Sequence, residues 1–471
     1  MESTEASQTP RCHALPALIC HRPVAIIIAV LILSLLAVLQ IVNPRTGEIH
    51  ARVDPSEQAL LGENHEGWEF YQFARHTFGN DETIMVAIDS DDVFSPETVD
   101  LVIRLTGRLS QIEGVDKVVS LANVLAIRST EYGMDVAPLM EVVPETPEDY
   151  EALRAQAIEN PFISDALISG DGKTTAILVN LEETQDYALI KRVNIAIDEI
   201  VGEEAGNARA WITGLPRILL ATKEIVLDDL VRFPPLIMLL MMVLLWLFLR
   251  SAVGVLVPLV TVLVSVTWTM ATIIALGFSL NILTALVPPL LMILTLSYSM
   301  YIVSDFRLSM RSEHTGEHEV AEILHKASLP VLLAGMTTAV GFSSLYASEL
   351  SAIREFGLFS VIGVVYATIV SLTFTPSLLV MLKRWSPKLE KPVVPETGTA
   401  FDHIIKQVAR FDSEHRAAIY IIAGAVFIIS LGGMTQLRVG TEHLTNFRPD
   451  TEIRQAFEHA NARLNGINPF S

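Results

Sequence analysis

Seven runs of apolar residues constrain this chain more than any other feature of its sequence. The first, Pro23–Val42, has 20 residues without a charge, and about 20 apolar residues in a helix cross a hydrocarbon core of roughly 30 Å. The other runs are Phe233–Leu249, Ala252–Leu276, Leu280–Val303, Leu329–Ala347, Gly357–Leu382 and Ala417–Met434. We therefore predict a polytopic α-helical membrane protein with seven transmembrane helices.

A cleaved signal peptide is the alternative for the first run. Its apolar stretch is longer than a signal peptide's hydrophobic region, and no small-residue cleavage site follows it. We therefore predict an uncleaved first span over residues 23–43.

Basic residues in the short connections predict the orientation, because Lys and Arg are enriched in cytoplasmic loops. With seven spans, the following residues all fall on one side: Arg11, Arg22, Arg250, Arg307, Arg311, Lys326, Lys383, Arg384, Lys388, Lys391, Lys406, Arg410 and Arg416. The segment 1–22 and the linker 383–416 are then cytoplasmic. Residues 44–232 and 435–471 are then outside the cytoplasm.

The acidic excess of the chain lies in one region. Residues 44–232 contain 35 acids and 15 bases, and the remaining residues contain 18 of each, so this region carries the whole net charge of −20. Nothing in the chain is basic enough to indicate nucleic-acid binding. Its two cysteines, Cys12 and Cys20, exclude a disulfide framework. An acidic aqueous domain joined to a neutral membrane part follows.

Alternation and capping signals give this domain an α+β pattern. We expect a helical lead-in (Pro55–Phe78), a strand (Thr83–Ser90), a helix that starts at Ser95 and a second strand (Gly114–Leu121). A hairpin (Asp165–Glu182), a helix (Asp186–Glu204) and a last strand (Ala208–Gly214) should follow. The hairpin turns at Gly170-Asp171-Gly172. This order suggests a split βαβ, ferredoxin-like layer.

Three short motifs imitate chemical sites, and each has a simpler explanation. "GDGKTT" lacks the first glycine of a phosphate loop, because Leu167 stands there, so a hairpin turn is expected. "DSDD" (Asp89–Asp92) could suggest calcium, but a solvated strand end is favoured. "HTGEH" (His314–His318) matches a zinc motif by letter, but Gly316 weakens the helix that it needs. We expect no metal, no cofactor and no enzyme activity.

The segment after the seventh span resembles the segment after the first. Both place Arg-Val beyond the apolar run and then a helix with an aromatic residue. Repeated halves are common in transporters. Residues 435–471 therefore suggest the start of a second, truncated external domain. Before the seventh span, Phe401–Arg416 has the spacing of an interfacial helix.

An ordered set of segments carries a family resemblance. The segments are "ITGLPRI", "FLRSAVGVLVPLV", "LNILTALVPPLL", "SYSMYIVSDFR", "GMTTAVGFSSL", "IREFGLFSVIGV" and "TFTPSLLVML". The chain resembles the resistance-nodulation-division superfamily, in particular its MMPL-like branch with a sterol-sensing-type membrane domain, here residues 233–382. The resemblance implies a proton-driven transporter of lipids or other hydrophobic molecules in the bacterial inner membrane, with residues 44–232 as a porter domain. It also implies a second half-transporter or an oligomer as partner.

The resemblance places a proton-relay position in the fourth span. The family typically has an Asp-Tyr pair there, and the matching residues are Ser297 and Tyr298. A serine does not titrate in the useful range. Tyr298, Tyr301 and Asp305 are spaced i, i+3, i+7 and so should share one helix face. We expect this stripe to contact either the transport pathway or neighbouring helices, and we expect no acid inside spans two to six.

Two further features of the spans concern packing. Pro288 and Pro289 should break the fourth span near Asn281 and Thr284, either as a packing kink or as a gating hinge. The small-residue pairs Gly335/Ala339 and Gly363/Ala367 indicate close helix contacts.

Two functions from different classes remain open. The first is a transporter of hydrophobic molecules. The second is a non-transporting lipid sensor or accessory subunit without proton coupling, which the missing acid at Ser297 favours.

Overall fold

The computed structural model of the chain describes most of its 471 residues. The described residues are 22–42, 44–45, 50, 52–54, 66–78, 82–130, 133–160, 163–164, 166–184, 186–206, 208–309, 317–385, 406–408, 410–411, 414–436 and 447–464. Cys12, Cys20, His314 and Gly316 lie outside them, as does part of the expected interfacial helix 401–416. The chain forms two units, which we call the membrane unit (residues 1–54 and 228–441) and the α+β unit (residues 55–227 and 442–471).

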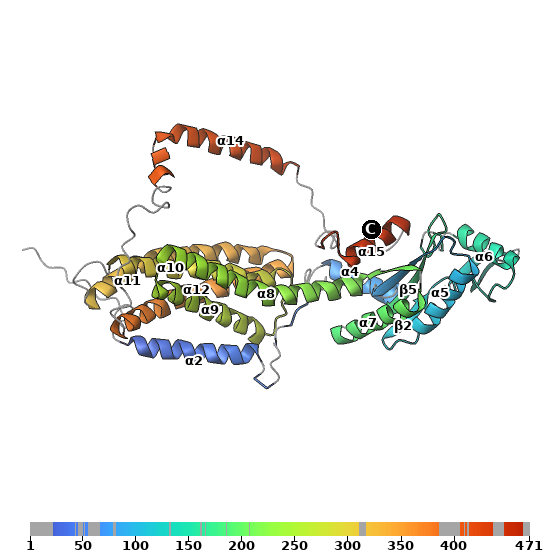
Figure 1. The fold of residues 1–471 in the computed structure, drawn as a ribbon, viewed down its shortest axis with the longest axis horizontal. Helices are drawn as coiled ribbons and strands as arrows, with labels where there is room; N and C mark the ends of the chain where they lie inside the picture. The colour runs from blue at the N-terminus through green and yellow to red at the C-terminus, as the bar shows by residue number, and fades with distance from the viewer. Residues whose placement is uncertain are drawn as a thin grey trace, which may run out of the picture. The chain divides into compact units, whose positions relative to one another are not determined.

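Among the described residues, seven helices are long and apolar enough to cross a membrane, as the sequence predicts. They are α2 (Pro23–Ile41), α8 (Leu215–Leu249), α9 (Ala252–Ala275), α10 (Val287–Ser309), α11 (Glu317–Ser343), α12 (Ser351–Trp385) and α14 (Arg416–Met434) (Figure 1). Two short 3₁₀ helices, η1 (Thr284–Leu286) and η2 (Ser344–Ala347), precede α10 and α12. The chain is a multi-pass membrane protein.

Helices α9, α10 and α12 form the interior of the membrane unit, and α2 and α11 pack against them. Val262, Leu291 and Phe374, from these three helices, are almost completely buried. In contrast, α8 and α14 expose large apolar side chains such as Leu247 and Ile429. Such surfaces suit contact with lipid chains.

Glycines allow the spans to approach closely. A Cβ added at Gly363 would lie 2.3 Å from Leu291 Cδ1, and one added at Gly335 would lie 2.3 Å from Thr368 Oγ1. A Cβ at Gly357 would lie 2.8 Å from the carbonyl oxygen of Phe342. The close contacts predicted for the two small-residue pairs are therefore confirmed at their glycines.

The connection between α8 and α9 has only two residues. Helix α8 ends at Leu249, and Ser251 caps the start of α9 by accepting a hydrogen bond from the backbone N–H of Gly254. The residue between them, Arg250, has φ = 47°, which is a left-handed conformation. The chain thus reverses direction at once.

The α+β unit contains a four-stranded antiparallel sheet in the order β2-β5-β1-β6. Its strands are β1 (Thr83–Asp89), β2 (Val115–Val119), β5 (Thr174–Leu181) and β6 (Arg209–Gly214). Helices α5 (Pro96–Leu109) and α7 (Tyr187–Glu204) connect them. Because β5 separates β1 from β2, the order is that of a split βαβ layer, and the predicted fold class is confirmed.

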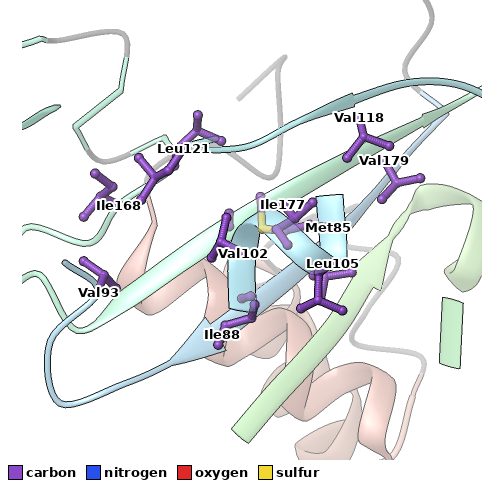
Figure 2. Close-up of a cluster of buried hydrophobic side chains, with 14 of the residues drawn as sticks. Met85, Ile88, Val93, Val102, Leu105, Val118, Leu121, Ile168, Ile177 and Val179 are labelled. Carbon is purple, nitrogen blue, oxygen red and sulfur yellow. The ribbon is translucent and has the colours of Figure 1, made fainter. Parts of the chain in front are cut away.

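The hydrophobic core lies between this sheet and its helices (Figure 2). Strand β1 contributes Met85 and Ile88, and β5 contributes Ile177 and Val179. Helix α5 adds Val102 to the same cluster. The helix starts as predicted, because Ser95 Oγ accepts a hydrogen bond from Thr98 N–H and Pro96 occupies the first turn.

A hairpin of β3 (Leu125–Thr130) and β4 (Gly133–Pro138), and helix α6 (Pro147–Glu159), were not predicted. The described part of the expected helical lead-in forms helix α4 (Glu66–Phe78). The expected hairpin keeps its turn, where Ser169 Oγ accepts the backbone N–H groups of Lys173 and Thr174. Strand β5 (Thr174–Leu181) follows the turn, whereas before it Ile168 makes isolated bridges to Ser164 and Thr175.

A final helix, α15 (Glu452–Arg463), packs on β6 of the same unit. Its Ala460 and the following Leu464 are buried in the core that Figure 2 shows in part. Residues from the segment after the seventh span thus contribute to the domain formed by the segment after the first.

Candidate functional site

The hydroxyl-bearing side chains of helix α10 lie on two different sides of the helix. Ser297 and Tyr301 are exposed, Tyr301 to 44%, whereas Tyr298 is only 6% exposed. Asp305 has intermediate exposure. The expectation that Tyr298, Tyr301 and Asp305 share one face is therefore too coarse. Residues spaced three apart on a helix differ by about 60° around its axis, which is enough to place one inside a bundle and one outside.

Tyr298 lies in an apolar environment. Its ring belongs to a buried cluster with Val257 of α9, Ile302 of α10 and Val331 of α11. Its hydroxyl has no hydrogen-bond partner within the described residues, and the same is true of the buried hydroxyls of Thr295, Ser360 and Ser371. These four groups place unpaired polar atoms on α10 and α12, two helices that pack together.

The two prolines stand at the start of a helix and do not bend its middle. The 3₁₀ helix η1 ends at Leu286, and α10 begins at Val287, so Pro288 and Pro289 occupy its first turn. Proline is tolerated there because the N–H groups of the first turn have no helical acceptor. The proline pair therefore marks the start of the long helix of the fourth span, where the sequence predicted a break within that span.

Asn281 and Thr284 fix this helix start through reciprocal hydrogen bonds. Asn281 Oδ1 accepts the backbone N–H groups of Leu283 and Thr284, at 3.0 and 2.8 Å. In return, Thr284 Oγ1 accepts the N–H of Asn281 at 2.8 Å. Both side chains are buried, to 1% and 0% exposure. This arrangement satisfies donors that a helix start leaves unpaired.

Asn281 also binds an acid that the sequence interpretation placed outside the spans. Its Nδ2 donates to Glu355 Oε2 at 2.9 Å. The sixth span was predicted to begin at Gly357, but α12 begins at Ser351, so Glu355 lies within the helix that crosses the membrane. The predicted range of the sixth span contains no acid, but the helix starts earlier than predicted, and Glu355 lies in its first turns. The signal for the earlier start was present in "IREFG", where Ile353 and Phe356 continue the helical spacing of the apolar run.

Neutral hydrogen bonds connect the other spans. Thr261 and Thr375 hydroxyls lie 2.8 Å apart and join α9 to α12, and Thr272 and Tyr366 join the same helices at 3.1 Å. Trp268 Nε1 donates to Ser34 Oγ at 3.0 Å and joins α9 to α2. These paired groups therefore connect neighbouring helices, whereas Ser360 and Ser371 of α12 have no such partner in the described part of the chain.

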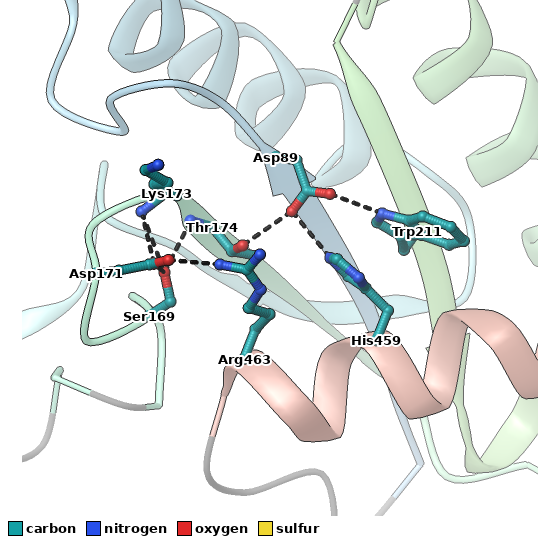
Figure 3. Close-up of polar contacts among 8 residues, drawn as sticks. All are labelled: Asp89, Ser169, Asp171, Lys173, Thr174, Trp211, His459 and Arg463. Atoms are coloured by element: carbon teal, nitrogen blue, oxygen red, sulfur yellow. Dashed lines mark hydrogen bonds and ion pairs between the residues drawn. The ribbon is translucent and has the colours of Figure 1, made fainter.

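A second polar cluster lies in the α+β unit, around Asp89 at the end of β1 (Figure 3). Asp89 Oδ1 accepts a hydrogen bond from Thr174 Oγ1 at 2.8 Å and lies 3.0 Å from His459 Nε2. Its Oδ2 accepts from Trp211 Nε1 at 2.9 Å. The indole and the His459 ring stack with centroids 4.7 Å apart. The expectation that this strand end is simply solvated is wrong for Asp89.

Burial alone would raise the pKa of the Asp89 carboxyl. The hydrogen bonds from His459, Trp211 and Thr174, together with the charge of His459, outweigh that effect and hold the pKa below its ordinary value. Next to this cluster, Arg463 pairs with Asp171 of the glycine turn (Figure 3). The cluster therefore attaches α15 to the sheet, a role that the sequence pattern does not indicate because Asp89 and His459 are 370 residues apart.

The metal-like motifs gain no support in the part of the chain that the structure describes. No group of three or more His, Cys, Asp or Glu side chains there could hold a metal ion. Within "DSDD", Asp92 pairs with Arg154 and caps the N–H of Phe94. The first histidine of "HTGEH" lies outside the described residues.

Comparison with known proteins agrees with this architecture. A profile of the MMPL family matches residues 72–411, which is more than two-thirds of the chain. The chain is 19% identical over 389 residues to MJ1562 of Methanocaldococcus jannaschii, which is named as a membrane protein; that match covers 80% of this chain and 95% of the relative. It is 27% identical over 95 residues to MmpL11 of Mycobacterium leprae, which is named as a transport protein; that match covers 20% of this chain and 9% of the relative. The family match covers five of the seven spans and most of the α+β unit, which has the predicted topology, and its extent leads to one conclusion: the chain belongs to the MMPL family.

Proposed function

We propose that this protein transports lipids or other hydrophobic molecules across the bacterial inner membrane. The supporting observation is the polar interior of the membrane unit, where Thr295, Tyr298, Ser360 and Ser371 bury hydroxyls that have no partner among the described residues. Polar groups that no neighbour satisfies are costly at membrane depth and commonly mark pathways. The α+β unit then acts as a porter domain on the outer side, as the transporter class suggests.

Reconstituted protein tests this proposal directly. The full chain in lipid vesicles should move a fluorescent phospholipid analogue between leaflets faster than protein-free vesicles do. Tyr298→Phe keeps the ring and removes the unpaired hydroxyl, whereas Tyr346→Phe, at an exposed tyrosine, is the matched control. We expect slower movement in the first variant only. Equal rates with and without the protein would contradict the proposal.

Proton coupling is the finer part of the proposal. Ser297 occupies the position where a titrating acid is expected, so we infer that this chain does not relay protons through that residue. Ser297→Asp should introduce or increase dependence of the lipid movement on an imposed pH gradient. The unchanged chain should show little dependence. Strong gradient dependence of the unchanged chain would contradict this inference.

A non-transporting lipid sensor or accessory subunit is the second candidate. The serine at position 297 favours it, because a coupled pump needs a group that titrates. The two candidates differ in the vesicle experiment: a sensor binds the lipid analogue with no acceleration of its movement.

The orientation of the chain also forms part of the proposal, with the N-terminus in the cytoplasm. In a background without Cys12 and Cys20, a membrane-impermeant maleimide should label Asp91→Cys in intact spheroplasts. Arg250→Cys should be labelled only after permeabilisation. Both positions are exposed, so accessibility of the side chain is not limiting. The reverse pattern would invert the topology.

We further propose that a second copy or a second half-transporter contacts the exposed side of α10. Ser297 and Tyr301 place hydroxyls beside Ile293 on that side, although lipid would favour apolar residues there. Ser297→Cys should form cross-linked dimers in membranes in a background without Cys12 and Cys20. Val340→Cys, at a 70% exposed position of α11, is the control and should not.

A further inference from the structure

A pocket of about 390 Å³ lies in the membrane unit between the C-terminal ends of α2 and α9. It is lined by Leu39, Gln40, His50, Arg52, Ile274, Gly277 and Phe278. We propose that this pocket binds the phosphate headgroup of a membrane phospholipid. The inference goes beyond the proposed function, because lipid binding here does not require transport.

Two basic side chains line the pocket, and neither pairs with another protein group in the described part of the chain. His50 and Arg52 are both exposed. Their backbones are fixed: the N–H of His50 donates to the Ile41 carbonyl at 2.8 Å, and the N–H of Leu280 donates to the Arg52 carbonyl at 2.6 Å. The backbone that carries these two side chains is therefore anchored beside the pocket. Both side chains remain available for an anion.

The backbone at Arg52 is fixed from the other side as well. The N–H of Asp54 donates to the Leu280 carbonyl at 2.9 Å, so residues 52–54 and Leu280 form a short parallel bridge. This bridge joins the segment that follows α2 to the segment that follows α9. The pocket is thus built between two anchored segments.

Three of the lining residues are large and apolar. Leu39 comes from α2, Ile274 from the end of α9 and Phe278 from the segment that follows α9. The Phe278 ring meets the Phe359 ring of α12 edge to face, with centroids 5.1 Å apart. Gly277 has φ = 79° and ends α9, and a Cβ there would have no atom within 4 Å. Its missing side chain leaves the pocket open.

These features together select the ligand class. An arginine guanidinium matches the oxygens of a phosphate, and Leu39, Ile274 and Phe278 offer apolar contact to the adjoining glycerol and acyl carbons. The ends of two membrane spans lie at headgroup depth, where a phospholipid presents these two parts together. The volume falls within the range of small-ligand pockets. Free phosphate can contact the same basic side chains, but it makes no contact with the apolar residues of the pocket.

Native mass spectrometry of the full chain in detergent tests the proposal. Phosphatidylglycerol is titrated against the unchanged chain and against the double variant His50→Gln/Arg52→Gln. The double variant should bind about tenfold more weakly. Arg209→Gln removes one charge from an exposed position in the α+β unit and should bind as the unchanged chain does. Diacylglycerol, which lacks the phosphate, should not compete.

A second variant keeps the test decisive if the double variant fails to fold. Leu39→Trp fills the pocket without a change of charge, and it should also weaken phosphatidylglycerol binding. Equal binding by the unchanged chain and both pocket variants would overturn the proposal. Competition by diacylglycerol would overturn the phosphate preference, and competition by equimolar inorganic phosphate would identify free phosphate as the ligand in place of lipid. The experiment measures binding and not lipid movement, so failure of this inference is separate from failure of the transport proposal.

Discussion

The two units of this protein use different kinds of polar contact between their elements. In the α+β unit, ionised groups join segments: Asp89 binds His459, and Arg104 and Arg108 of α5 pair with Glu204 of α7. In the membrane unit, most of the contacts described above are made by hydroxyl, indole and amide groups, Glu355 being the exception, and glycines bring the backbones together.

This difference follows from the surroundings of each unit. Water solvates a charge that loses its partner, so an aqueous domain tolerates ionic contacts on its surface at little cost. Hydrocarbon offers no such solvation, so spans are better joined by neutral groups and close packing. Stability of the α+β unit should therefore respond to pH, and stability of the membrane unit should respond mainly to side-chain volume.

A change of volume at Gly357 should give the largest effect. Gly357→Val places a Cβ 2.8 Å from a backbone oxygen that cannot move freely, and overpacking of this kind costs roughly 3 kcal/mol. Thermal unfolding of the purified chain in detergent should show a clear loss. Gly424→Val on α14 is the matched control, because nothing lies within 4 Å of its Cβ position. A similar loss in both variants would contradict the packing argument.

Removal of the Asn281 side chain should have the next largest effect. Asn281→Ala leaves the N–H groups of Leu283 and Thr284, and also Glu355, without this partner, at a cost of about 2 kcal/mol. The same unfolding experiment measures it. Glu355→Gln keeps an oxygen that accepts from Asn281, so it should cost much less. If it cost as much as Asn281→Ala, the charge of Glu355 would account for most of the loss, contrary to our expectation.

Neutralisation of Asp89 should destabilise the α+β unit by about 1.5 kcal/mol at neutral pH, because the hydrogen bonds then lose their charged acceptor. Unfolding of Asp89→Asn can be followed by tryptophan fluorescence, since the Trp211 indole contacts both Asp89 and His459. Asp91→Asn changes the same charge at an exposed neighbouring position and should be close to neutral.

The unchanged chain and Asp89→Asn should also differ in pH dependence, with a definite sign. The pKa of Asp89 is lower in the folded state than its ordinary value of about 3.9. Its contribution is then fully present above that value and is lost as the pH falls through the folded-state pKa. The difference in stability between the two proteins should shrink as the pH is lowered from about 5 toward about 3. A constant difference would show that the contribution is not electrostatic.

A single neutral contact in the membrane unit should give the smallest effect. Thr375→Val removes the hydroxyl that meets Thr261 and keeps the shape, and such contacts between spans average about 0.6 kcal/mol. Unfolding of the single variants and of Thr261→Val/Thr375→Val should yield a small coupling energy. A coupling as large as the Asp89 effect would remove the distinction between the two units.

The features that were predictable from the sequence are those with a repeating pattern or a local signal. The seven apolar runs give the spans, and Ser95-Pro96 gives the start of α5, because helix length and capping depend on neighbouring residues. The packing of Gly335 and Gly363 was also predictable, since small residues at helical spacing permit close approach.

The features that were missed depend on residues far apart in the chain. Nothing in the sequence near Asp89 or His459 indicates that these two residues bind each other, and α15 packs on β6 only in the folded unit. The contact between Asn281 and Glu355 was missed for the same reason, because these two residues are 74 positions apart in the chain.

The two-residue connection between α8 and α9 limits how the membrane unit can open. Leu249 and Ala252 are three Cα–Cα steps apart, so their Cα atoms cannot separate by more than about 11 Å. A lipid cannot pass between the two helices at that end. Any lateral exit between them must widen toward their other ends, with Arg250 as the apex of the wedge.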